Sequence, residues 1–229
     1  MEMSNVRNML KAYILIGMDS DYRNPIQTLK NDILGYETLL ETLGTHYTDD
    51  PVIQKSIINS KSAWTHVENA LQTALENVDI EKMKQVTVFI HGNIRSVIKE
   101  LAFMKKHLLE KSSIKDKEAL DASIEIAASA RRLSAHYMMS MWDIQDPTIE
   151  EHWEKGMEKY AKGLEVLKDS SYVKDPKFMG LLKSCQKYHI YFTKMWKKPK
   201  KFAALIDKKT NIVFKDAKEM TKLILESAE

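Results

Sequence analysis

The chain has 229 residues, of which 44% are hydrophobic and 29% charged, so it is long enough to bury a core and too apolar to be disordered. Its 7 glycines and 5 prolines are too few for a turn-rich β protein, and no apolar run reaches the length of a membrane span. The net charge of +3 gives no bulk support for nucleic-acid binding, and the lone Cys185 excludes a disulfide framework within one chain.

Taken in chain order, four Xaa-Pro pairs mark predicted helix starts, with Asn or Asp as the N-cap and Pro at the first helical position. They are Asn24-Pro25, Asp50-Pro51, Asp146-Pro147 and Asp175-Pro176. The first and third prolines are 122 residues apart, and the second and fourth are 125 apart. An offset kept this closely predicts an internal duplication.

The apolar periodicity predicts the helices themselves. They cover about residues 3–20, run onward from Pro25 and from Pro51, cover about 79–111 and 115–143, then run onward from Pro147, from Pro176 and from near Pro199. Within the last helix, the polar stretch from Asp207 to Asn211 is interpreted as a break or kink. The fold class predicted is all-α: an elongated up-and-down bundle of about eight helices in two related four-helix halves, residues 1–112 and 113–229, forming two domains or one continuous one.

No catalytic or metal-binding motif is present. The seven histidines are scattered, and none lies four residues from another as a helical metal pair requires. His189 lies on an apolar stripe, where packing is favoured over ligation. Glu150, Glu151 and His152 suggest a diiron-type site, but no second helix supplies a matching motif. The sequence therefore predicts a protein that is not an enzyme and needs no metal or cofactor.

Two further stretches have a functional and a structural interpretation. Lysines flanking Trp196 and Phe202 are typical of RNA or acidic-membrane binding, but a solvated corner between helices is favoured because the remainder of the chain is not basic. These lysines are Lys194, Lys197, Lys198, Lys200, Lys201, Lys208 and Lys209. The Met-rich run from Tyr137 to Trp142 could form a soft ligand pocket, although core packing is favoured.

The strongest functional candidate is the pair Arg131 and Arg132, followed by Ser134. Consecutive helical residues point about 100° apart, so we expect one of the two guanidinium groups to lie near the bundle seam. A buried guanidinium must find an anion or several acceptors. An internal partner such as a glutamate on a neighbouring helix is the first expectation, and a small external anion is the second. In the first half, Arg7 occupies a comparable place.

These motifs resemble a known family, the PilJ-type sensory domain of type IV pili methyl-accepting chemotaxis transducers, which is similar to the sensor region of nitrate and nitrite sensor kinases. The resemblance is carried by Met9–Met18 followed by Asn24-Pro25 in the first half, and by Arg131–Tyr137 in the second. Phe192–Trp196, Lys201-Phe202 and Leu205-Ile206 resemble the closing segment of the family.

The resemblance implies a periplasmic sensory domain that takes part in chemotaxis signal transduction, binds a small oxyanion and pairs with itself or a signalling partner, with an export segment absent from this chain. The sequence departs from the family at Asn8, where an arginine is typical, and over Glu125–Arg131, where only the last arginine survives. The leading hypothesis is a ligand-binding domain that recognises a small anion near Arg131, with Arg132, Ser134 and Arg7 as further site residues. The alternative is a structural or protein-interaction module whose ligand site has degenerated.

Overall fold

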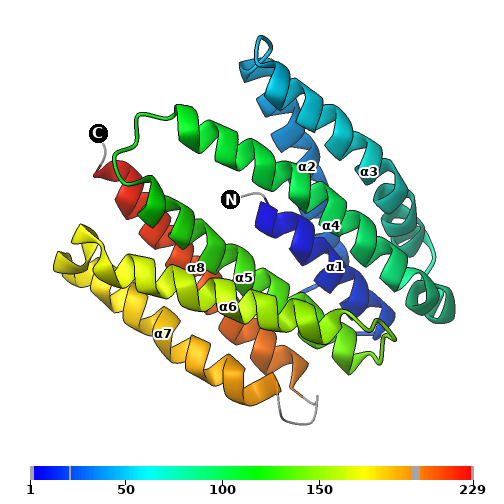
Figure 1. Ribbon diagram of the computed structural model, residues 1–229. Coiled ribbons are helices and arrows are strands. Elements are labelled where there is room, and N and C mark those ends of the chain that lie inside the picture. The colour runs from blue at the N-terminus through cyan, green and yellow to red at the C-terminus, as the bar shows by residue number, and fades with distance from the viewer. Residues whose placement is uncertain (1–2, 21, 197–201, 228–229) are drawn as a thin grey trace. The chain divides into compact units, whose positions relative to one another are not determined.

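The computed structural model describes residues 3–20, 22–196 and 202–227, and every regular element within them is helical (Figure 1). The chain is an all-α helical bundle, which confirms the predicted fold class. The eight α-helices of the described residues are α1 (Met3–Gly17), α2 (Pro25–His46), α3 (Pro51–Glu76), α4 (Ile80–Lys111), α5 (Lys117–Met141), α6 (Ile149–Asp169), α7 (Pro176–Trp196) and α8 (Ala203–Glu226). A short 3₁₀ helix, Ser171–Lys174, precedes α7. None of the described helices combines the length and the apolar character needed to cross a membrane.

The chain divides into two compact units. The first unit contains α1 to α4 and comprises Glu2–Ser112 together with the short segment Trp142–Asp146. The second unit contains α5 to α8 and comprises Ser113–Met141 and Pro147–Glu229. The chain therefore leaves the second unit after α5, contributes five residues to the first unit, and returns for α6.

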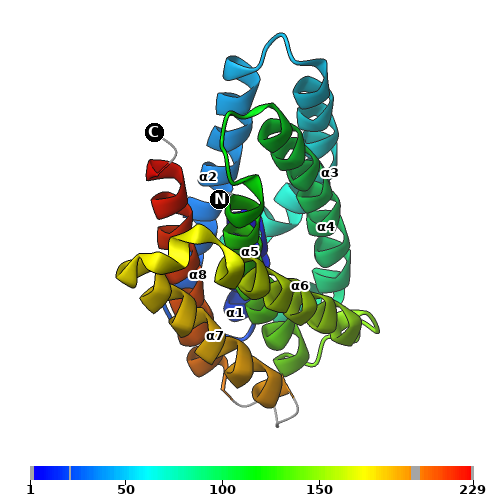
Figure 2. The same cartoon turned by 60° about the vertical axis from the view of Figure 1, so that its left-hand side comes forward.

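The helices of each unit have the same neighbours. In the first unit, α1 packs on α2 and α4, while α3 packs on α4 and α2. In the second unit, α5 packs on α6 and α8, while α7 packs on α8 and α6 (Figure 2). Each unit is thus a ring of four sequential helices, in which α1 corresponds to α5, α2 to α6, α3 to α7 and α4 to α8.

A buried tyrosine occupies the same place in each ring. The Tyr36 hydroxyl lies 2.9 Å from the Ser60 Oγ atom, joining α2 to α3. The Tyr160 hydroxyl donates to the main-chain oxygen of Cys185 at 2.8 Å, joining α6 to α7. Tyr160 follows Tyr36 by 124 residues, and Cys185 follows Ser60 by 125. Because a buried hydroxyl needs a partner, both copies keep one although the partner atom differs.

The next turn of the third helix extends this correspondence. The ring of Trp64 lies beside Tyr36 with a centroid separation of 4.6 Å, and the ring of His189 lies beside Tyr160 at 5.1 Å. His189 follows Trp64 by 125 residues. His189 is therefore a packed side chain in the place of a tryptophan, which confirms the favoured interpretation of that histidine.

Three of the four predicted N-caps are confirmed. The side chain of Asn24 accepts a hydrogen bond from the Gln27 amide at the start of α2. The Asp50 carboxylate caps α3, and that of Asp175 accepts from the Lys177 amide at the start of α7. These short polar side chains satisfy main-chain N–H groups that the first helical turn leaves without a partner.

The prediction for Asp146 is wrong. The sixth helix begins at Ile149, after Thr148, instead of directly after the Asp146-Pro147 pair. The Asp146 carboxylate instead contacts the His91 ring on α4, with 2.9 Å between the Oδ2 and Nδ1 atoms. A carboxylate that serves this buried contact is not placed to cap α6.

The predicted break in the last helix is also wrong, because α8 continues without interruption from Ala203 to Glu226. Its polar residues face the interior and bond to the preceding turn. The Thr210 hydroxyl donates to the Ile206 main-chain oxygen at 3.0 Å, and the Asn211 side-chain amide donates to the Asp207 main-chain oxygen at 2.8 Å. Polar residues that bond to the helix itself need not interrupt it.

The Met-rich run is core, as favoured, since Met138 and Met139 are fully buried. The predicted start of the last helix near Pro199 lies outside the described residues. So do four lysines of the predicted basic stretch, Lys197, Lys198, Lys200 and Lys201.

Candidate functional site

Helix α5 carries the candidate residues and is buried over most of its circumference, from Ile126 to Ala130 and from Leu133 to Met139. Its face toward α8 is fixed by Ser123, whose Oγ atom lies 2.9 Å from the Thr221 Oγ1 atom. Ser134 follows Ser123 by eleven residues. Eleven residues are close to three full helical turns, so Ser134 lies on the same face of α5.

Arg131 reaches α8 one turn before Ser134. Its side chain is half-buried, and its Nη1 atom donates to the Asn211 side-chain oxygen. The guanidinium carbon lies 4.1 Å from the centroid of the Phe214 ring, which is within cation–π range. The prediction that one of the paired arginines lies at a helix seam is therefore confirmed for Arg131.

The amide of Asn211 continues this contact into the interior. Its Nδ2 atom donates to the Oδ2 atom of Asp207 at 2.8 Å. The Asp207 side chain is fully buried. A guanidinium, an amide and a carboxylate are thus connected through hydrogen bonds, and we call Arg131, Ser134, Asp207 and Asn211 the α5–α8 polar cluster.

Two hydroxyl groups of the second unit are buried, that of Ser134 in this cluster and that of Tyr191 on α7. The Ser134 side chain has no exposed surface, and its Oγ atom has no hydrogen-bond partner among the described residues. The phenol oxygen of Tyr191 on α7 is likewise buried and unpaired within the described part of the chain. Burial raises the pKa of Tyr191, and the neighbouring Tyr137 phenol raises it further. Leaving a buried polar group unpaired costs about 1–3 kcal/mol, so such groups point to a water or ligand partner.

The structure does not bring all of the predicted site residues to this cluster. Arg132 turns toward α6, where its Cδ atom lies 3.1 Å from the position of a Cβ atom built on Gly156. Arg7 belongs to α1 of the first unit and is buried, with 8% of its surface exposed. Beside it, Asn8 donates to the Asp32 carboxylate at 2.6 Å. Of the four predicted residues, only Arg131 and Ser134 share a site.

The α8 side of the cluster was not predicted. Asp207, Asn211 and Phe214 are spaced by four and three residues, which places them on one helical face. That spacing was the available signal, but the lysines between these residues made the stretch resemble a break. The expected internal partner was a group such as a glutamate, and the structure shows the amide of Asn211 in contact with Arg131.

The first unit keeps only one residue of this cluster. Relating α8 to α4 by the 123 residues that separate Thr87 from Thr210 places Lys84 at the position of Asp207 and Val88 at that of Asn211. Relating α5 to α1 by the 124 residues between Tyr13 and Tyr137 places Arg7 at the position of Arg131 but Leu10 at that of Ser134. The complete set of arginine, serine, aspartate and asparagine is therefore found in the second unit and not at the equivalent positions of the first.

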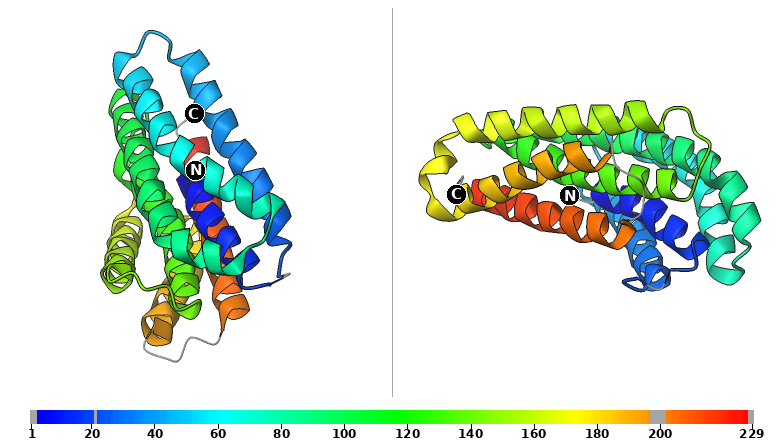
Figure 3. Two further views of the ribbon diagram at one scale, coloured as in Figure 1. Left: turned by 90° about the vertical axis from the view of Figure 1, so that its right-hand side faces the viewer. Right: turned by 90° about the horizontal axis from the view of Figure 1, so that it is seen from below.

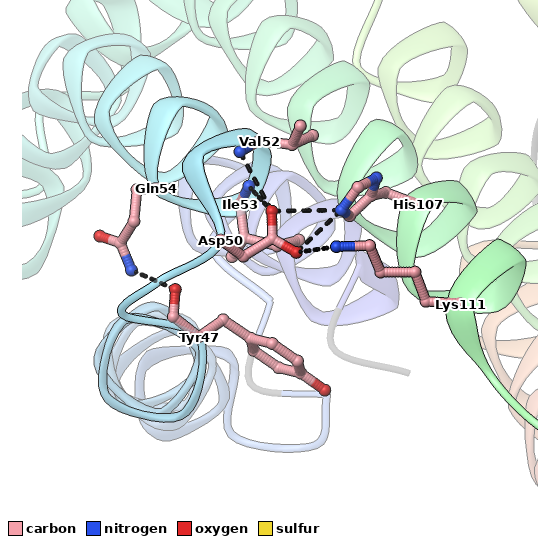
Figure 4. A network of polar contacts seen from close by, with 7 residues as sticks. All are labelled: Tyr47, Asp50, Val52, Ile53, Gln54, His107 and Lys111. Carbon is pink, nitrogen blue, oxygen red and sulfur yellow. Dashed lines mark hydrogen bonds and ion pairs between the residues drawn. The ribbon is translucent and has the colours of Figure 1, made fainter.

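A second polar network lies in the first unit and closes the end of the α3–α4 pair (Figure 4). The Asp50 carboxylate accepts hydrogen bonds from the Lys111 Nζ atom at 2.8 Å and from the His107 Nε2 atom at 2.9 Å. It also accepts from the Val52 and Ile53 amides. The bonds from Lys111 and then His107 hold the pKa of Asp50 well below its usual range. A carboxylate held by four donors serves to anchor the helix end and is poorly suited to act as a base.

The His91–Asp146 contact is the other candidate for acid–base chemistry. Both side chains are about one-twentieth exposed, at 5% and 6%. Burial lowers the pKa of His91, although the hydrogen bond and charge of Asp146 oppose the shift.

Comparison with models of known protein families, with curated proteins and with solved structures finds no match to this chain. Among the described residues, no group of three or more histidine, cysteine, aspartate or glutamate side chains is arranged to hold a metal ion. The functional inference therefore rests on the α5–α8 polar cluster itself.

Proposed function

We propose that the chain is a non-enzymatic sensory or ligand-binding module, and that its second unit binds a small anion at Arg131. The observation that carries the proposal is the fully buried Ser134 hydroxyl, which has no partner among the described residues and lies one helical turn along α5 from Arg131. A guanidinium supplies the charge and paired donors that carboxylates and oxyanions prefer, and a hydroxyl adds a rotatable donor. The resemblance to PilJ-type sensors supports the same ligand class, a periplasmic location and a signalling partner or second copy as the recipient of the signal.

A thermal-shift screen tests this proposal with nitrate, phosphate and small carboxylates as probes. A ligand present at a hundred times its dissociation constant stabilises the folded state by about 2.7 kcal/mol. For a chain of this size that corresponds to a rise in Tm of about 5–11 °C. We expect at least one probe to produce such a rise in the wild-type protein.

The neighbouring arginine provides the matched control. The Arg131→Gln variant should lose the anion-dependent rise, whereas Arg132→Gln should keep it because Arg132 is directed toward α6. The Ser134→Ala variant should weaken binding while keeping the Tm without ligand close to that of the wild type. The ligand role of Arg131 is refuted if no anion stabilises the protein, or if Arg131→Gln responds as the wild type does.

A structural or protein-interaction module is the second candidate function. The observation that favours it is the internal use of Arg131, which already donates to Asn211 and covers the Phe214 ring. In that case Arg131→Gln lowers the Tm in the absence of any anion, and no probe raises it. Light scattering then shows whether the module assembles with itself, and a strict monomer argues against a homodimeric scaffold.

A further inference from the structure

The segment that contains α7 and α8 is basic. Between Pro176 and Glu226 there are thirteen lysines and four acidic residues, a net charge of +9, whereas the whole chain carries only +3. The remainder of the chain is therefore acidic, with a net charge of −6. Four of the thirteen lysines lie outside the described residues, so α7 and α8 themselves carry nine lysines and a net charge of +5, close to the +4 of α3 and α4.

The structure organises part of this charge into stripes. On α7, the exposed residues Lys183, Lys187, Ile190 and Lys194 follow one another by four, three and four positions, which places them on a single face. On α8, the exposed lysines lie on the solvent-facing side together with Leu205; they are Lys208, Lys215, Lys218 and Lys222, the last of which also pairs with Glu226. Each stripe contains one exposed aliphatic side chain among its lysines.

The two stripes lie on neighbouring helices. Helices α7 and α8 pack against each other and lie side by side (Figure 3). The Lys209 ammonium group on α8 lies 5.0 Å from the ring centroid of Tyr188 and 4.9 Å from that of Tyr191, both on α7. This contact joins the two helices that carry the stripes.

Exposed apolar side chains accompany the charge. Ile190 is 57% exposed, Leu205 40% and Phe202, at the start of α8, 45%. A basic face with exposed apolar residues suits the boundary between lipid headgroups and acyl chains, where lysines meet anionic phosphates and apolar groups enter the acyl region. Single-stranded nucleic acid requires open aromatic faces for base stacking, but Lys209 already lies over the Tyr188 and Tyr191 rings.

We propose that the α7–α8 face, defined by the lysines of the two stripes with Ile190, Phe202 and Leu205, docks on the surface of a membrane that contains anionic phospholipids. The lysines attract the protein to the negative surface, and the three apolar side chains enter the interfacial layer. This surface function does not depend on a ligand at Arg131.

Vesicle co-sedimentation with the full chain tests the proposal. Vesicles of phosphatidylcholine with about a third phosphatidylserine should bind the protein at 0.1 M salt, and pure phosphatidylcholine vesicles should not. Each lysine near an anionic surface contributes about fivefold to the partition coefficient at low salt. The triple variant Lys187→Gln/Lys194→Gln/Lys208→Gln should therefore partition at least a hundredfold less, and 0.5 M salt should release the wild type.

Two further variants separate charge number from charge position and test the apolar contribution. The control Lys55→Gln/Lys61→Gln/Lys99→Gln removes three exposed lysines from α3 and α4, and should partition within about fivefold of the wild type. The variant Phe202→Ser/Leu205→Ser keeps every lysine and should partition at least tenfold less. Its side chains are exposed, so folding should be unaffected, as circular dichroism would verify.

The proposal is overturned if phosphatidylserine vesicles fail to bind the wild type, or if the two triple lysine variants partition equally. It is also overturned if Phe202→Ser/Leu205→Ser binds as the wild type does, because charge alone would then explain the attraction. A protein that binds a labelled single-stranded RNA in fluorescence anisotropy, and leaves the vesicles untouched, would assign the basic face to nucleic acid instead.

Discussion

Gly163 on α6 lies close against α5, and this contact yields a quantitative prediction. A Cβ atom at this position would lie 2.9 Å from the Ile126 Cγ1 atom and 3.1 Å from the Ala122 main-chain oxygen. Both distances are shorter than normal contacts, and the oxygen belongs to a helix backbone that cannot retreat alone. Gly163→Ala therefore adds an overpacking cost of about 1–3 kcal/mol, against a gain in helix propensity of about 1 kcal/mol.

Gly180 supplies the matched control within the same unit. It lies on α7, and a Cβ atom there would meet nothing within 4 Å. Gly180→Ala should therefore show only the propensity gain, roughly 0.5–1 kcal/mol. At about 2–4 °C per kcal/mol, the Tm of Gly163→Ala should lie several degrees below that of Gly180→Ala. Thermal unfolding followed by circular dichroism measures both values, and equal Tm values would refute the close packing of α5 on α6.

Three further predictions concern the first unit. Gly17→Ala should lower the Tm and alter Trp142 fluorescence, because the new Cβ atom would overlap the Trp142 ring. Trp142→Ala in the same background should restore most of the loss in Tm. Because the pKa of Asp50 is lowered in the folded state, its contribution to the free energy of unfolding is complete above the ordinary aspartate pKa and is lost as the pH falls below that value. In an acid-unfolding experiment, Asp50→Asn should therefore lose less stability than the wild type between about pH 5 and about pH 2.5, the range in which aspartate titrates. The lowered pKa of His91 means that the folded state prefers the neutral ring, so urea stability should be full above about pH 6.5 and fall below it. His91→Gln should flatten that fall, and an unchanged pH dependence would contradict the assignment.

The sequence alone was sufficient to predict the helices, because each has an apolar stripe with helical spacing and several have a polar cap before a proline. Periodicity failed where polar residues are buried. Asp207 and Asn211 interrupt the apolar pattern of α8, yet the helix remains continuous. The Asn211 side chain accepts from Arg131 and donates to Asp207 one turn earlier, so these polar groups are satisfied without a break. Nothing local to Asp146 distinguishes it from Asp50 or reveals that its partner lies 55 residues earlier in the chain.

Only the α5 side of the candidate site could be predicted from the sequence, because the α8 side depends on contacts between helices. The sequence shows that Arg131 and Arg132 point in different directions, but the choice between them depends on which neighbouring helix each one meets. That information lies in Asn211 and Phe214 on α8 and in Gly156 on α6. A contact between helices is set by their packing, which a periodic pattern within one helix does not encode.

The two units preserve their packing and differ in their chemistry. The Tyr36–Ser60 contact and the Tyr160–Cys185 contact join equivalent helices, so the requirement that a buried hydroxyl be satisfied is met in both copies. Such constraints do not act on the solvent-facing sides of α7 and α8, which carry the exposed lysines of the two stripes. The proposed anion site and the proposed membrane-docking face both belong to the second unit. The first unit supplies the control lysine substitutions for the membrane proposal, whereas Arg132 on α5 supplies the control for the anion site.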